Sequence, residues 1–194
     1  MQRTSSKYIL KIVVVGLMAA LVFATSNLQI KLPVAAGEIT RIHLGNSMCL
    51  LAGLLFGGVT GGLSAGIGSC IFDLLDPVYI SSAPFTFVFK FLLAFVCGVI
   101  AHSKLNNGTN TKINIMGAIL GQLTYIILYL SKGFVFSLLE GNAVSTTWVT
   151  TGQRALASSI NAVVAIIIAV PLALIIRKSL SKTSFSQLMN TRKL

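Results

Sequence analysis

Six apolar segments dominate this sequence, and each approaches the length that a helix needs to cross a membrane. Only 10% of the 194 residues are charged and 55% are hydrophobic, whereas about a quarter of the residues in a soluble domain are charged. An apolar helix of about 20 residues spans the hydrocarbon core of a bilayer. The sequence therefore predicts an all-α, integral membrane six-helix bundle, a single transmembrane domain over residues 1–194 with spans near 8–28, 44–58, 60–76, 84–103, 113–139 and 152–176.

The placement of the basic residues predicts the orientation of this bundle. A net charge of +11 would suggest nucleic-acid binding in a soluble protein. Here most basic residues fall on one side of the membrane if the helices alternate, and basic loops stay in the cytoplasm. We therefore expect both termini to be cytoplasmic. The inner basic residues are Arg3, Lys7, Lys11, Lys104, Lys112, Arg177, Lys178, Lys182, Arg192 and Lys193.

A glycine-rich stretch, GGVTGGLSAGIGS from Gly57 to Ser69, comes close to a phosphate-binding loop, but Leu63 stands where the lysine should be. A phosphate loop also needs a preceding strand and a soluble helix after it. The small residues instead recur every fourth position, which places them on one helical face where backbones approach closely. The stretch predicts two short helices that pack tightly and join through almost no loop.

The longer connections are predicted to lie outside. The longest is about 29–43, which Pro33 and Gly37 are expected to make irregular. The others are 76–83 and 140–147. Any loop that could cover a ligand is therefore extracellular.

Polar residues inside the apolar segments gather in the outer half of the membrane. Lys90, for example, lies roughly 9 Å inside the outer end of its helix at 1.5 Å per residue, and Asn46 and Asp73 are expected to be shallow. Ionisable residues within a membrane indicate functional sites, and a pore would need polar residues through its full depth. The pattern predicts an outward-facing binding pocket formed by Asn46, Asp73, Lys90, Tyr125, Tyr129, Lys132, Arg154 and Asn161.

Simpler roles remain open for several of these residues. Asp73 can pair with Lys90 or Arg154 only to neutralise a buried charge, and Lys132 and Arg41 can extend to the outer surface. Tyr79 and Trp148 are typical of interfacial aromatics. Tyr125 and Tyr129 share a helical face, which can stack on a planar ring or simply pack.

Catalytic chemistry is not expected. The chain has four acidic residues, and no carboxylate pair accompanies a histidine in the way that an intramembrane hydrolase or metalloenzyme requires. The three cysteines sit in apolar segments without a C-x-x-C pair, which indicates small core residues rather than a disulfide or metal site. We expect no cofactor and no metal.

The first apolar segment also carries small residues at helical spacing. Gly16, Ala20 and Ala24 form small-x-x-x-small steps, which allow close helix approach. They can pack within the bundle or form a docking face for another membrane protein.

Several short motifs lie along nearly the whole chain: His43-Leu-Gly-Asn46, Leu51-Ala-Gly-Leu-Leu-Phe-Gly57, Gly61-Gly-Leu-Ser-Ala-Gly-Ile-Gly68, Phe72-Asp-Leu-Leu75, Ser82-Ala-Pro-Phe-Thr-Phe87 with Lys90, and Asn161-Ala162. Together they resemble the S components of energy-coupling factor (ECF) transporters, the substrate-capturing subunits of bacterial vitamin uptake systems. The resemblance is closest to the riboflavin, hydroxymethylpyrimidine and vitamin B6 branch.

The resemblance implies the function and the partners. It implies a multi-pass protein of the bacterial plasma membrane that binds a vitamin-like small molecule outside and docks on a T subunit carrying two ATPase subunits. It also implies that an Ala-x-x-x-Ala motif in the first helix docks on the T subunit. Ala20 with Ala24 matches this motif strictly, and Gly16 with Ala20 matches it loosely. The lysines and Arg154 would suit a carboxylate or phosphate, which riboflavin lacks. A standalone secondary transporter is the alternative, and a membrane scaffold without a ligand is a further one.

Overall fold

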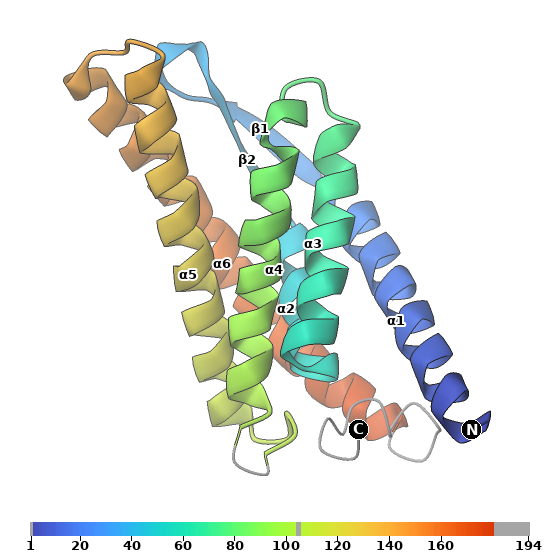
Figure 1. Cartoon of the computed structure of the whole chain (residues 1–194). Helices are drawn as coiled ribbons and strands as arrows, with labels where there is room; N and C mark the ends of the chain where they lie inside the picture. The colour runs from blue at the N-terminus through green and yellow to red at the C-terminus, as the bar shows by residue number, and fades with distance from the viewer. Residues whose placement is uncertain (1, 104–105, 181–194) are drawn as a thin grey trace.

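The computed structural model describes residues 2–103 and 106–180, and it contains six α-helices within these ranges (Figure 1). Of the basic residues used to predict the orientation, Lys104, Lys182, Arg192 and Lys193 lie outside the described residues. The elements are α1 (Gln2–Ser26), β1 (Gln29–Pro33), η1 (Ala35–Gly37), β2 (Ile39–His43), α2 (Gly45–Phe56), α3 (Gly58–Leu74), η2 (Ile80–Ser82), α4 (Ala83–Ala101), α5 (Thr111–Leu139) and α6 (Val144–Leu180).

The helices alternate in direction, so the connections segregate to two ends of the bundle. The start of α1, the α2–α3 turn, the end of α4, the start of α5 and the end of α6 lie at one end (Figure 1). The β1–β2 hairpin, η2 and the α5–α6 turn lie at the other. This arrangement agrees with the predicted inner and outer sides, and we refer to the two ends by those names.

In the part of the chain that the structure describes, four helices have the length and composition to cross a membrane: α1, α4, α5 and α6. The two glycine-rich helices are shorter. With 12 residues, α2 is about 18 Å long at 1.5 Å per residue, well short of the roughly 30 Å hydrocarbon core. Eleven of its residues are buried, and only Met48 is not. The second predicted span is therefore an enclosed core helix rather than a lipid-facing one.

Glycines allow this enclosure, as the sequence predicts. At Gly57, φ is 80°, a left-handed conformation that lets α2 turn into α3 through a single residue. A Cβ added to Gly61 would lie 2.5 Å from the Cα of Gly53, and one added to Gly53 would lie 2.4 Å from the carbonyl oxygen of Ala94. The backbones of α2, α3 and α4 therefore contact one another directly, which only glycine permits.

The outer loop predicted to be irregular is instead an antiparallel hairpin. β1 pairs with β2 in a register that places Lys31 opposite Arg41. Ala36 and Gly37 both have positive φ and close the turn. The segment Ile39-Thr-Arg-Ile-His43 is rich in β-branched residues, which favour strands. The expectation of an irregular loop was wrong because Pro33 ends β1 and Gly37 lies in the turn, where neither residue interrupts the strand pairing.

Candidate functional site

Two adjoining cavities occupy the outer end of the bundle. The inner cavity has a volume of ≈ 90 Å³ and lies among the hairpin, α4, α5 and α6. The outer cavity, of ≈ 460 Å³, lies above it toward the α5–α6 turn. The two share six lining residues and so form one site with a narrow lower part: Ile39, Tyr79, Ser82, Lys132, Gly133 and Arg154.

Seven of the eight residues predicted to form the pocket line the inner cavity. Asn46 is the exception, since it lies fully buried and contacts Lys90, which does line the cavity. The structure thus brings the predicted residues together from four helices, while their role in ligand binding stays a prediction. The seven are Asp73, Lys90, Tyr125, Tyr129, Lys132, Arg154 and Asn161.

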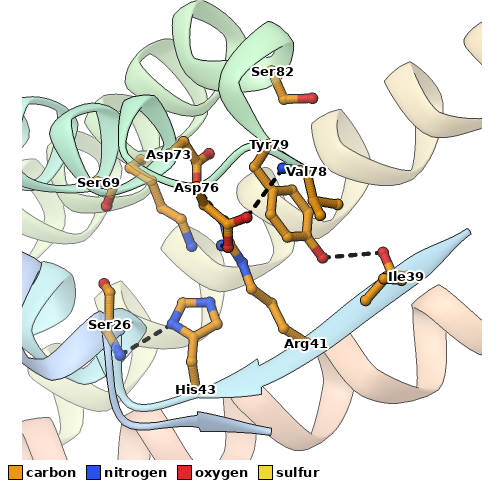
Figure 2. A network of polar contacts seen from close by, with 12 residues as sticks. Ser26, Ile39, Arg41, His43, Ser69, Asp73, Asp76, Val78, Tyr79 and Ser82 are labelled. Carbon is orange, nitrogen blue, oxygen red and sulfur yellow. Dashed lines mark hydrogen bonds and ion pairs between the residues drawn. The ribbon is translucent and has the colours of Figure 1, made fainter. Parts of the chain in front are cut away.

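Arg41 of β2 is the central cation of this site, and the expectation that it extends to the outer surface was wrong. Its guanidinium pairs with the carboxylate of Asp73, and the two side chains are only 13% and 1% exposed. It lies 3.7 Å from the ring centroid of Tyr79 and 3.9 Å from Asp76 Oδ2. Figure 2 shows Arg41 reaching from β2 toward these residues. Asp73 therefore pairs with Arg41 and not with Lys90 or Arg154, the two partners that the sequence suggested.

Tyr79 is also fixed by the hairpin rather than by the membrane interface. Its hydroxyl donates to the carbonyl oxygen of Ile39 at 3.1 Å (Figure 2). The pKa of Tyr79 is raised to about 12, mainly because the phenol is buried. The phenol thus stays protonated and holds β2 against the loop that follows α3.

A second ion pair joins the hairpin to α6. Arg154 pairs with Glu38, which directly precedes β2. The neighbouring Gln153 accepts a hydrogen bond from the backbone N–H of Ala35 at 2.8 Å. The turn of the hairpin is thereby fixed to the outer part of α6.

Asn161 satisfies the free backbone groups of β2. Its Oδ1 accepts from the N–H of His43 at 2.9 Å, and its Nδ2 donates to the carbonyl oxygen of Arg41 at 2.9 Å. This two-way contact replaces a missing neighbouring strand, since buried backbone groups need partners. Asn161 therefore positions the hairpin, a role that the sequence did not indicate.

Lys90 forms the floor of the cavity. Its side chain is 3% exposed, and Nζ donates to Asn46 Oδ1 while lying 3.8 Å from the ring centroid of Tyr125. Asn46 in turn donates to Gln122 Oε1 at 3.3 Å. Asn46, expected to be shallow, is as deep as Lys90, because the hairpin brings the chain into the bundle before α2 begins.

The two tyrosines of α5 form one wall. The ring centroids of Tyr125 and Tyr129 are 5.7 Å apart with an interplanar angle of 10°. The Tyr129 and Thr40 hydroxyls are 3.4 Å apart. This parallel pair presents an aromatic surface beside Lys90.

Lys132 lies at the junction of the two cavities. Its Nζ donates to Ser82 Oγ at 3.0 Å and lies 4.6 Å from the ring centroid of Phe136. The ammonium therefore lies between η2 and α5. Lys132 is therefore half-buried at the site rather than extended to bulk water.

His43 adds a neutral group to the wall. Its Nδ1 accepts from the N–H of Gly45 at 3.1 Å. Burial, and then the charges of Lys90 and Arg41, hold the pKa of His43 well below its usual range. The imidazole is therefore uncharged at neutral pH. Among the described residues, no group of three His, Cys, Asp or Glu side chains is arranged to hold a metal ion.

Sequence reasoning missed four residues that shape the site: Arg41, His43, Tyr79 and Gln122. Arg41 and His43 lie in β2, so the β-branched residues of 39–43, read as a strand, would have revealed both of them. Tyr79 contacts this strand through Ile39. Gln122 stands as a lone amide in an apolar run, and such a residue needs a buried partner.

The small residues of α1 face away from the bundle. Gly16, Ala20 and Ala24 are exposed, and no atom lies within 4 Å of a Cβ built on Gly16. The opposite face, with Val14, Met18 and Val22, is buried. The alternative in which the three residues pack within the bundle is therefore wrong.

Three comparisons with known proteins found a family and two proteins to which the chain is similar. The profile of the family described as ECF-type riboflavin transporter, S component, matches residues 6–178. An uncharacterized protein in gap 3'region of Pyrococcus woesei is 27% identical over 110 residues, which make up 57% of this chain and 70% of that protein. A solved structure of the S component of a bacterial ECF transporter has a TM-score of 0.58 at 20% identity, and the match covers 86% of this chain and 97% of the other. At this identity the solved structure shows a shared fold.

Proposed function

The chain belongs to the family of ECF-type riboflavin transporter S components. We propose that it captures a vitamin or vitamin precursor in the two cavities at the outer end of the bundle and delivers it to a T subunit and ATPase subunits. The family is one of substrate-binding transport subunits and not of enzymes. We place the protein in the bacterial plasma membrane, as a single transmembrane domain over residues 1–194 with both termini in the cytoplasm.

The observation that carries this proposal is a polar cavity that opens toward one end of the bundle and is closed below. Its wall combines paired charges, two stacked tyrosines and the buried Lys90. Beneath the floor, the core of α2, α4 and α6 is apolar, with Leu50, Leu54, Leu93 and Ala169 fully buried. A binding site with one opening suits capture from outside, with release on the other side left to a partner.

The eight predicted pocket residues are the proposed substrate-binding residues. Asp73, Arg154 and Asn161 act mainly by holding the hairpin over the cavity. Tyr125 and Tyr129 offer a flat surface to a ring, and Lys90 and Lys132 offer donors. Asn46 supports Lys90 from below. Because the hairpin lies across the cavity, we expect it to move when a substrate enters.

The exposed small residues of α1 are the proposed docking surface for the T subunit. Gly16, Ala20 and Ala24 lie along the outward face of a helix that is long and apolar enough to span the membrane. Small side chains let two helix backbones approach closely within lipid, where van der Waals packing drives association. A partner helix can therefore approach α1 most closely along this line.

Isothermal titration calorimetry of the purified protein against a panel of vitamins and precursors tests the capture function. We expect saturable 1:1 binding of at least one compound. Absence of binding across the panel would favour a scaffold role and contradict the proposal. Uptake by cells that lack T and ATPase subunits would instead favour a standalone secondary transporter.

A further inference from the structure

The cavities contain more cationic than anionic groups. Four cations line the inner cavity: Arg41, Lys90, Lys132 and Arg154. Among the described residues, a single carboxylate lines it, that of Asp73. The outer cavity adds two more carboxylates, Glu38 and Glu140.

The two arginines already have carboxylate partners. Arg41 pairs with Asp73, and Arg154 pairs with Glu38. Both pairs fix the hairpin to the helices around it. These charges therefore have a structural use, and they neutralise each other before any ligand is present.

The two lysines have no such partner. Within residues 2–103 and 106–180, neither Lys90 nor Lys132 forms an ion pair with a carboxylate. Lys90 contacts an amide oxygen and the face of a tyrosine ring. Lys132 contacts a hydroxyl oxygen and the face of Phe136. These neutral contacts hold each ammonium in place without forming an ion pair, while Asp73 acts on both lysines, and Glu140 on Lys132, as more distant carboxylates.

An uncompensated ammonium is costly away from water, and an ionisable residue within a membrane usually marks a ligand or ion site. Lys90, at 3% exposure, is enclosed beside Tyr125. Lys132 lies at the junction where a ligand would pass between the two cavities. We propose that the ligand is a planar ring that carries an anionic group, a carboxylate or a phosphate, received by Lys90 and Lys132 while the ring lies against Tyr125 and Tyr129. This inference rests on the proposed capture function.

Matched pairs of compounds that differ in one charged group test this inference on the wild-type protein. Suitable pairs are nicotinamide with nicotinate, pyridoxine with pyridoxine 5′-phosphate, and riboflavin with riboflavin 5′-phosphate. Calorimetry in detergent measures Kd for each member. We expect the anionic member of at least one pair to bind about tenfold tighter or more, because charge-assisted hydrogen bonds are stronger than neutral ones. The nicotinate pair reports on a carboxylate and the other two on a phosphate.

Substitution of each lysine identifies the receiving group. Lys90→Met and Lys132→Met should each reduce the preference for the anionic member to about threefold or less, since the charge-assisted bond is lost. Lys112→Met, an exposed change of the same kind at the inner end, should leave the preference unchanged. Lys90→Gln serves as a second variant if Lys90→Met unfolds, which a thermal unfolding curve reports.

Four results would count against the inference. Equal or tighter binding of the neutral member in every pair would overturn it, and so would a preference that survives both lysine substitutions. Binding of no member in any pair, together with no binding across the wider vitamin panel, would contradict the capture function itself. Binding of neutral vitamins alone would leave that function standing and reject only the anionic class.

Discussion

Replacing Arg41 with methionine should destabilise the protein more than any other single change to the hairpin. Methionine keeps a flexible apolar chain and removes the guanidinium with its charge. The carboxylate of Asp73 is 1% exposed, and its Oδ2 already lacks a hydrogen-bond partner. Arg41→Met therefore leaves a buried carboxylate without its ion-pair partner.

The expected loss follows from this burial. Removing one member of a buried ion pair costs about 3–5 kcal/mol, because the other charge stays desolvated. At about 1.4 kcal/mol for each factor of ten, the unfolding equilibrium constant should rise by roughly 10² or more. Asp73→Asn should cost less, since Arg41 retains Asp76 at 3.9 Å. The double variant Arg41→Met with Asp73→Asn should recover much of the loss because it leaves no buried carboxylate at position 73.

The assay is denaturant unfolding in detergent, followed by far-UV circular dichroism, with hydrogen exchange of the hairpin amides as a second measurement. Arg41→Met should speed exchange over residues 29–43 more than in α2. Lys31→Met is the matched control, since Lys31 is 41% exposed in its pair with Asp76 and such surface pairs contribute only about 0–1 kcal/mol.

Two outcomes would refute this reasoning. Wild-type stability and hairpin exchange in Arg41→Met would show that the pair does not fix the hairpin. A double variant no more stable than Arg41→Met would show that the unpaired carboxylate is not the source of the cost.

Three further predictions concern packing, pH and docking. Gly61→Ala should lower the free energy of unfolding by about 1–3 kcal/mol, since overpacking forces backbones apart and the new Cβ would meet Gly53 Cα at 2.5 Å. Gly152→Ala is the control, because no atom lies within 4 Å of its new Cβ, and it should not lower the denaturation midpoint. Equal losses in the two variants would contradict the close-packing argument. Burial lowers the pKa of His102, just beyond α4, to about 4. Because the imidazole in the unfolded chain titrates near 6.5, the stability that this residue contributes is fully present above about pH 6.5 and is lost as pH falls toward 4. Between pH 7.5 and 5.0 the thermal midpoint should therefore fall less in His102→Gln than in the wild-type protein. An identical fall in both proteins would contradict this prediction. Ala20→Trp should block both uptake and co-purification with the T subunit but leave ligand binding intact. Leu156→Trp, on the exposed face of α6, is the control and should leave uptake and co-purification unchanged. Normal uptake in Ala20→Trp would place docking elsewhere.

The helical part of the fold was predictable because hydrophobicity alone determines it. Long apolar runs require helices in lipid, where backbone groups must be satisfied within the segment. The four-residue spacing of glycines likewise predicted the close contact of α2 and α3. What hydrophobicity could not show is that α2 is enclosed, because an enclosed helix and a lipid-facing helix are equally apolar.

The site was predictable as a set of residues but not as a set of contacts. Depth along each helix placed Lys90, Tyr125 and Asn161 in one layer. The ion-pair partners depend on the hairpin, which lies outside the apolar segments and follows strand periodicity. Once the hairpin was treated as an irregular loop, the pairing of Arg41 with Asp73 could not be anticipated.

Native mass spectrometry of the ligand retained by the protein tests the central claim most directly. Wild-type protein and Lys90→Met are purified from the same cells and exposed to one mixture of vitamins and their phosphorylated forms. The proposed function predicts one retained small molecule at 1:1 in the wild-type protein, strongly reduced in Lys90→Met at a matched folded fraction. Equal retention by both proteins would show that Lys90 does not help to hold the ligand, and no retention by either would contradict substrate capture at the outer end of the bundle.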